Sequence, residues 1–158
     1  MMKLIAHRGN VNGSNCLEEN NPEYIEDAIL KGFDVEIDLR YNSTDNTFYL
    51  GHDEPQYIID KFWLEKYKNY LWIHCKNIES LFEFTYGTSG FNYFWHQEDD
   101  FTLTSKNYIW TYPGKPYTPM SVIVMPEWNK NPNQIGELKL FDCYAICSDY
   151  VENLNVQK

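Results

Sequence analysis

The sequence predicts an α/β fold built on a compact (β/α) barrel, and two observations lead to this prediction. Strand and helix patterns alternate along the first half of the chain, which is typical of a parallel sheet. The second half adds strand patterns with short connections, for about seven or eight strands in all. A complete barrel of this kind needs about 200 residues or more, and the chain has 158. We therefore expect a single domain, residues 1–158, folded as a TIM-like barrel with several outer helices shortened or missing.

The first half is predicted to hold three buried strands and the helices that follow them. Strands are expected at 3–8, 33–39 and 70–76, with a short extended piece at 48–50. The first helix begins at Asn21-Pro22-Glu23, because Asn is a favoured N-cap, proline suits the first turn and an acid complements the helix dipole there. It ends near Lys31-Gly32. Two more helices are predicted at 60–69 and 78–86.

The second half has less helix signal. Strands are predicted at 93–96, 108–112, 121–125 and 144–148, and a helix near 133–140. No internal repeat, low-complexity segment or Gly/Ser linker divides the chain, which supports a single domain.

The composition argues against several classes of partner. The net charge is −10, from 13 basic and 23 acidic residues. Such a surface repels phosphate backbones and anionic lipid headgroups, so we expect neither nucleic acid nor a membrane as a partner. No signal-peptide pattern begins the chain and no apolar stretch approaches the length of a membrane span, so we expect a soluble cytoplasmic protein. The four cysteines include no C-x-x-C pair, and we expect all four to be reduced.

The most informative local pattern is F-D-V-E-I-D-L at 33–39, where acids alternate with apolar residues. Residues i and i+2 of a strand share a face, so Glu36 and Asp38 project together, opposite Val35 and Ile37. Two carboxylates that point into a barrel cost several kcal/mol unless they are compensated. A divalent cation such as Mg²⁺ or Ca²⁺ would compensate them. The alternative is a solvated face of an edge strand.

Further polar residues fall at or near the ends of the predicted strands. His7-Arg8-Gly9 ends the first strand, His52-Asp53 follows the extended piece, and His74 and Lys76 form another i, i+2 pair. Each has a structural alternative when taken alone: a core or exposed histidine, or a lysine that reaches solvent. Barrel enzymes place their sites at the C-terminal ends of the strands, so together these residues predict one active site.

These motifs resemble the glycerophosphodiester phosphodiesterases, within the phospholipase C-like phosphodiesterase superfamily. That family has a strand ending in H-R-G, as at His7-Arg8-Gly9, and then P-E-N-T, of which Glu19-Asn20 keeps E-N. Its G-A-D-x-I-E-x-D-V block resembles residues 32–39, its H-D resembles His52-Asp53, and its closing I-x-T-D-x-P resembles 145–150. The chain resembles a short, divergent member, because residues 88–140 match nothing in the family and His74 stands where its I-E-x-K has Glu.

The resemblance implies metal-dependent hydrolysis of a glycerophosphodiester-like substrate, as part of lipid metabolism. It implies that His7 and His52 act as the acid–base pair and that Arg8 and Lys76 bind the phosphate. The implied metal ligands are Glu36, Asp38, Glu19 and His74. Mg²⁺ or Ca²⁺ is favoured, and the histidine adds Mn²⁺ and Zn²⁺ as candidates.

Three further residues, His96, Trp110 and Glu127, are candidates for lining the substrate, with core packing or a structural role as the alternative. Two other functions stay open. One is a lyase acting on phospholipid head groups, from the same superfamily, and the other is a non-catalytic module that binds a phosphorylated ligand. We also predict a homodimer, because a barrel with bare strands needs a partner to cover them.

Overall fold

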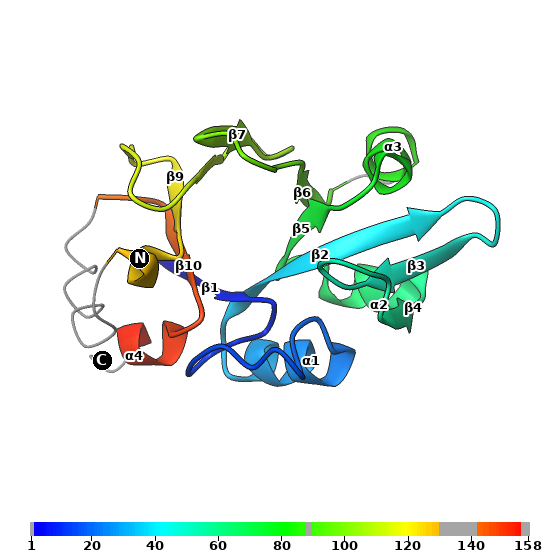
Figure 1. Cartoon of the computed structure of the whole chain (residues 1–158), viewed down its shortest axis with the longest axis horizontal. Coiled ribbons are helices and arrows are strands. Elements are labelled where there is room, and N and C mark those ends of the chain that lie inside the picture. The colour runs from blue at the N-terminus through cyan, green and yellow to red at the C-terminus, as the bar shows by residue number, and fades with distance from the viewer. Residues whose placement is uncertain (1, 88–89, 130–141, 156–158) are drawn as a thin grey trace.

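The computed structural model describes residues 2–87, 90–129 and 142–155, and in these ranges a curled β-sheet is accompanied by a small number of helices (Figure 1). The first half supplies β1 (Lys3–His7), α1 (Pro22–Leu30), β2 (Asp34–Asn42), β3 (Thr47–Leu50), β4 (Tyr57–Ile59), α2 (Lys61–Tyr67), β5 (Leu71–Cys75) and α3 (Ile78–Tyr86). The second half supplies β6 (Asn92–Phe94), β7 (Phe101–Leu103), β8 (Ile109–Thr111), β9 (Ser121–Val124), the short 3-10 helix η1 (Pro126–Trp128), β10 (Ala145–Ser148) and α4 (Val151–Asn155). The helix predicted near 133–140 lies outside the described residues.

Most strands of the sheet run parallel. Strands β6, β5, β2, β1, β10, β9 and β8 are neighbours in that order, and each pair is parallel. The hairpin strands β3, β4 and β7 join antiparallel. Beyond β7 the described residues form no ladder with β6, although the Ser105 N–H donates a 2.8 Å hydrogen bond to the Tyr93 carbonyl.

The prediction of a compact TIM-like barrel with shortened outer helices is wrong. The sheet instead curls into a half-barrel, and the chain forms mostly strands with few helices (Figure 1). Strands β3, β4 and β7 each pair antiparallel with a neighbouring strand. A (β/α) barrel places a helix after each parallel strand. In the described ranges β8 passes to β9 without a helix, and only the three-residue η1 follows β9. The chain is therefore a mixed α/β protein with few helices.

Each helix of the first half begins where a polar side chain caps it. Asn21 accepts a hydrogen bond from the Glu23 N–H at the start of α1, which confirms the predicted start at Asn21-Pro22. Asp60 and Asn77 accept from the Trp63 and Ser80 N–H groups at the starts of α2 and α3. Such caps satisfy backbone donors that have no partner inside the helix.

Strand β2 organises the molecule because its two faces differ as the sequence predicts. Val35, Ile37 and Leu39 are fully buried in the main apolar cluster, which also holds residues of α1, α2 and α3. Glu36 and Asp38 face the interior of the curl, and a second apolar cluster around Trp72 and Trp110 fills part of that interior. The alternation therefore places carboxylates inside the curl and apolar residues under the helices.

One edge of β2 is shared by two strands in succession. Strand β1 pairs with its beginning as far as Glu36, and β3 pairs with its end from Leu39 onward. Asp38 lies in the gap between them, so its backbone N–H has no strand partner on that edge. The side chain of Asn20 fills the gap: its Oδ1 accepts from the Asp38 N–H at 2.9 Å, and its Nδ2 donates to the Asp38 carboxylate at 3.0 Å.

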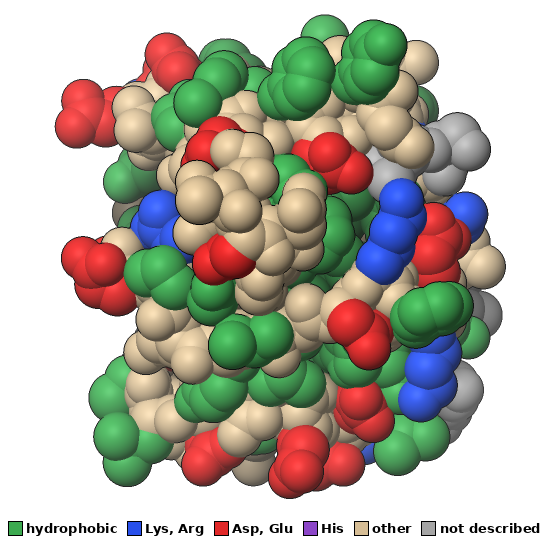
Figure 2. All heavy atoms as spheres, turned by 90° about the vertical axis from the view of Figure 1, so that its right-hand side faces the viewer, with side chains coloured by type: hydrophobic (Ala, Val, Ile, Leu, Met, Phe, Trp, Pro, Cys, Tyr) green, Lys and Arg blue, Asp and Glu red, His purple; other side chains and the backbone are tan. Residues whose placement is uncertain are grey.

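The surface carries apolar and acidic side chains intermixed. Figure 2 shows this on the face that α2, α3 and the β2–β3 hairpin form, where Phe62, Ile78 and Phe82 are exposed. In the described part of the chain, no helix is both long and apolar enough to cross a lipid bilayer. The four cysteines are free thiols, as expected from the sequence.

Candidate active site

A cleft of about 690 Å³ opens at the C-terminal ends of the parallel strands. It brings together most of the predicted site residues. Those that line it are His7, Arg8, Glu19, Glu36, His52, His74, Lys76, His96 and Trp110. Asp38 is fully buried among them. The predicted residues therefore converge on one place, although they come from segments far apart in the chain.

Glu36, Asp38 and His74 form a group that could hold a metal ion. Each offers one ligand atom, and these atoms lie within 4.8 Å of one another. The grouping follows from the strand register, because Asp38 on β2 stands directly beside His74 on β5. Two carboxylates and one imidazole suit Mn²⁺ or Zn²⁺, and the carboxylates alone suit Mg²⁺ or Ca²⁺.

The hydrogen bonds of His74 support this role. Its Nε2 lies 2.8 Å from the His96 carbonyl oxygen, which can only accept, so Nε2 carries a proton. In the neutral ring the other nitrogen, Nδ1, then has a lone pair. That nitrogen is 3.2 Å from Asp38 Oδ1 and 3.7 Å from Glu36 Oε1. The lone pair of Nδ1 and the two carboxylates repel one another unless a proton or a metal cation lies between them. Metal-bound histidines typically donate their other ring N–H to a carbonyl oxygen, as Nε2 of His74 does here.

The negative charges of Asp38 and Glu36 are balanced by their surroundings to different extents. Burial raises the pKa of Asp38, but hydrogen bonds from His52 and His74 and the charge of Arg8 outweigh it, so this pKa is held well below its usual range. For Glu36, burial and the nearby charge of Asp38 raise the pKa. Glu36 is only 2% exposed, and its Oε2 is buried with no hydrogen-bond partner among the described residues. Buried polar atoms are rarely left unpaired, and a cation at the group would satisfy this one.

The guanidinium of Arg8 contacts three side chains of the cleft. Its Nη1 donates to Glu19 at 2.9 Å and its Nη2 to Nδ1 of His52 at 2.8 Å. Its Nε lies 2.9 Å from Asp38 Oδ2 as an ion pair, although without the alignment of a hydrogen bond. The backbone of Arg8 is left-handed, with φ of 52°, which is uncommon for a residue other than glycine. Since a guanidinium has five N–H donors, both terminal nitrogens keep a donor for a ligand.

His52 depends on its loop for its position. Gly51, with φ of 149°, begins the turn, and a Cβ there would lie 2.0 Å from the Glu54 carbonyl oxygen, so another residue cannot replace it without rebuilding the turn. Arg40 then donates to the carbonyls of His52 and Asp53. The Nδ1 of His52 lies 2.8 Å from Nη2 of Arg8, which can only donate, and 3.3 Å from both carboxylate oxygens of Asp38, which can only accept when ionised.

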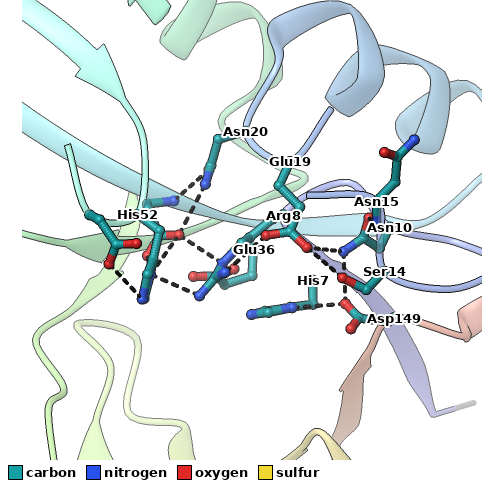
Figure 3. Close-up of polar contacts among 12 residues, drawn as sticks. His7, Arg8, Asn10, Ser14, Asn15, Glu19, Asn20, Glu36, His52 and Asp149 are labelled. Atoms are coloured by element: carbon teal, nitrogen blue, oxygen red, sulfur yellow. Dashed lines mark hydrogen bonds and ion pairs between the residues drawn. The ribbon is translucent and has the colours of Figure 1, made fainter. Parts of the chain in front are cut away.

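His7 is held by a residue from the other end of the chain. Its Nδ1 lies 2.8 Å from Asp149 Oδ1, and the opposite edge of the ring points toward the side where Arg8 and Glu36 lie (Figure 3). Burial lowers the pKa of His7, but the hydrogen bond to Asp149 and the charge of Glu36 raise it by more, so the net shift is upward.

Asp149 is itself held in place from behind. Glu127 accepts from the Asp149 backbone N–H at 2.8 Å and from the Ser148 hydroxyl at 3.0 Å. Glu127 was predicted to line the substrate, but it is not among the residues that line the cleft. It supports the segment that carries Asp149.

Glu19, a predicted metal ligand, has other partners. Its carboxylate accepts from Arg8, Asn10 and Ser14, and it is not part of the group formed by Glu36, Asp38 and His74. A metal role for Glu19 stays a prediction. Lys76, predicted to bind phosphate, lines the cleft with its Nζ 3.8 Å from Asp38 Oδ1.

Six further residues of the site were given no role from the sequence. They are Asn10, Ser14, Asn20, Arg40, Ser148 and Asp149 (Figure 3 labels Asn10, Ser14, Asn20 and Asp149). Arg40 continues the inward face of β2 at i+2 from Asp38 and could have been read from the alternation. Asp149 follows a buried strand pattern, which was a signal for the C-terminal end of a strand. Ser148 is the last residue of β10, and the other three side chains lie in loops without a periodic pattern.

Compared with known proteins, the chain matches no protein-family model, no curated protein and no solved structure. The resemblance to the glycerophosphodiester phosphodiesterases therefore rests on the quoted motifs alone.

Proposed function

We propose that the chain is a metal-dependent phosphodiesterase that hydrolyses a small, glycerophosphodiester-like substrate. The observation that carries the proposal is the meeting of three features in one cleft. These are the group of Glu36, Asp38 and His74, the cationic side chains of Arg8 and Lys76, and the two histidines His7 and His52. An anionic diester needs positive charge for binding and proton transfer for cleavage.

The histidines have different roles in the proposed mechanism. His7 has a raised pKa and is suited to donate a proton to the leaving alcohol. A neutral His52 is suited to take a proton from the water that attacks the phosphorus, while the P–O bond to the alcohol breaks and the alcohol leaves with the proton from His7. Arg8 and Lys76 bind the phosphate oxygens. A divalent metal held by Glu36, Asp38 and His74 would offset the negative charge that develops on those oxygens.

A turnover assay tests the proposal. Purified protein is given bis(p-nitrophenyl) phosphate or glycerophosphocholine with Mg²⁺, Mn²⁺, Ca²⁺, Zn²⁺ or EDTA. We expect turnover with at least one metal and none in EDTA. His7→Ala and His52→Ala should each lower the rate by at least about 100-fold. No turnover with any metal, together with unchanged metal binding in Glu36→Ala, refutes the proposal.

The products separate this function from its alternatives. Hydrolysis releases a phosphomonoester and an alcohol, whereas a lyase releases a cyclic phosphate. Metal and phosphate binding without turnover would indicate a non-catalytic binding module. The cytoplasmic location and the homodimer stay predictions, and fractionation of cells and analytical ultracentrifugation test them.

A further inference from the structure

The outer face of β7 and β8 carries apolar side chains at the surface. The two strands pair antiparallel, with Thr102 opposite Trp110 and Leu103 opposite Ile109. Trp110 lines the cleft, so the alternation turns Ile109 and Leu103 to the outer face, and Phe101 lies on the same face as Leu103. Phe101 is 45% exposed and Leu103 is 64% exposed. An apolar sheet face of this kind is normally buried against a second layer.

The fold explains why this face lacks a second layer. A (β/α) barrel covers the outside of its strands with helices. In the part of the chain that the structure describes, the α-helices pack on β1, β2, β5, β6 and β10, and Figure 1 shows none of them outside β7. Residues 112–120, which connect β8 to β9, form no helix. The outer side of β7 and β8 is therefore where the helix layer of a barrel is missing.

A groove of about 450 Å³ lies on this face, and its lining contains no charged residue. Charged residues make up 23% of the chain. Asp100 and Lys115, which adjoin the lining in sequence, form a 2.8 Å ion pair with each other. We call this surface the β7–β8 face, and its residues are Phe101, Thr102, Leu103, Ile109, Pro116, Tyr117, Thr118 and Ser121.

We propose that the β7–β8 face is the contact surface of a homodimer, in which a second copy of this chain takes the place of the missing helix layer. The inference gives a surface to the homodimer that the sequence predicts. It is independent of the proposed function, because neither a metal nor a substrate takes part in the contact.

The charge of the chain argues for a second copy at this face. Two copies that each have a net charge of −10 repel each other. Exposed charges interact over about 8–10 Å at physiological ionic strength, so the repulsion depends mainly on the charges close to the contact. In a two-fold dimer the same patch lies on both sides of the contact. At the β7–β8 face an uncharged lining meets an uncharged lining, and no like charges are brought together there.

A larger apolar groove, of about 710 Å³ on α3, fits a second copy less well. Ile78 and Phe82 are exposed along it, but Glu79 and Glu83 belong to the same lining. A two-fold contact at α3 would bring the glutamates of both copies together, and like charges that face each other across an interface oppose binding. The comparison of the two grooves therefore selects the β7–β8 face for self-association.

The proposed contact also lies behind one wall of the cleft. Strand β8 presents Trp110 to the cleft and Ile109 to the outer face. In the described pairings, β7 joins the sheet through β8 alone. A second copy that covers Ile109 would stabilise the strand that carries Trp110. We therefore expect Tm to rise with protein concentration, as it does when association stabilises the folded state.

Sedimentation velocity tests the inference over protein concentrations from about 5 to 300 μM. We expect a reversible monomer–dimer equilibrium with a Kd of about 1–100 μM, as suits a small contact surface. Raising NaCl from about 50 to 500 mM should lower this Kd, because salt screens the repulsion between two acidic copies.

Two lysine substitutions locate the contact. Leu103→Lys places an unpaired charge in the uncharged lining and should weaken dimerisation by at least about tenfold. Because the added lysine reduces the net negative charge, it also reduces the long-range repulsion, so weaker association must arise at the contact itself. Phe82→Lys changes the net charge equally at a position on α3 that is 61% exposed, and should leave the Kd within about twofold. Circular dichroism confirms that both variants are folded.

Four results would overturn the inference. They are a monomer at about 300 μM in both salt concentrations, a dimer that neither Leu103→Lys nor Phe101→Lys weakens, a dimer that Phe82→Lys abolishes, and a mass that continues to rise beyond the dimer. A dimer that Leu103→Lys weakens and Phe82→Lys does not supports the inference. The turnover assay tests the phosphodiesterase proposal separately, so either proposal can fail while the other stands.

Discussion

Replacing Glu36 by glutamine should stabilise the metal-free protein and abolish its response to metal. Glu36 is buried, one of its oxygens has no hydrogen-bond partner in the described structure, and its pKa is raised by burial and by the charge of Asp38. A raised carboxyl pKa means that the folded protein favours the neutral form, so the ionised side chain costs stability at neutral pH. Glutamine has nearly the same shape and no charge, and therefore removes this cost.

The expected size of the effect follows from the burial of the group. A buried group without a partner costs more when it is charged than when it is neutral, and we take about 2 kcal/mol for this difference, which is the gain in the free energy of unfolding. For a chain of this length, that gain raises Tm by about 4–8 °C. A metal at one hundred times its Kd adds about 2.7 kcal/mol to the wild type, or about 5–11 °C in Tm. The variant lacks one of the three ligands and should gain little from the same metal.

Thermal denaturation followed by circular dichroism tests both expectations, in EDTA and with excess Mn²⁺. Glu54→Gln is a matched control, because Glu54 is exposed and the change in net charge is the same. Its Tm should equal that of the wild type within about 2 °C, and its response to metal should be retained. A lower Tm for Glu36→Gln in EDTA, or an equal metal response in wild type and variant, would refute the reasoning.

Three further predictions follow from the same contacts. Because the hydrogen bond that His7 donates to Asp149 raises the pKa of His7, Asp149→Asn should lower that pKa and move the alkaline limb of the kcat/KM profile to lower pH; an unmoved limb would show that His7 is not the proton donor. Asn20 has φ of 64°, so Asn20→Gly should keep the backbone conformation and remove both hydrogen bonds to Asp38. Urea denaturation should show that the free energy of unfolding falls by about 1–3 kcal/mol. A change below about 0.5 kcal/mol, the size expected for a neutral surface substitution, would contradict the role given to Asn20. Cys16 is the exposed cysteine, so a thiol reagent should modify it first under native conditions, and rapid modification of a Cys16→Ser variant would contradict this.

The first half of the fold could be predicted because its strands have a clear period. Residues 33–39 alternate between acids and apolar residues, and the structure places them on opposite faces of β2. The caps at Asn21 and Asn77 mark helix starts by local chemistry alone. Since parallel strands carry their C-terminal ends to one edge, the convergence of His7 and His74 also followed from local patterns. His52 follows β3, which is antiparallel to β2, so its place beside Asp38 depends on the hairpin.

The parts that could not be predicted depend on distant contacts or on very short elements. Strands β4 and β7 have three residues each, too few to show alternation, and both are antiparallel, which is one reason that the barrel prediction is wrong. The site role of Asp149 depends on a contact with His7 across 142 positions of the chain. No local pattern specifies such a pairing, although the strand that ends at Ser148 was predicted.

The pairing of β1 with β10 also sets the order in which the cleft can be completed. Residues 7–76 leave the ribosome early and contain both carboxylates of the metal group, both proposed acid–base histidines and both phosphate-binding cations. The carboxylate that orients His7 arrives only with residue 149, and until β10 forms, that edge of β1 has no neighbour. If the proposed function holds, nascent chains should therefore bind metal before they can turn over substrate.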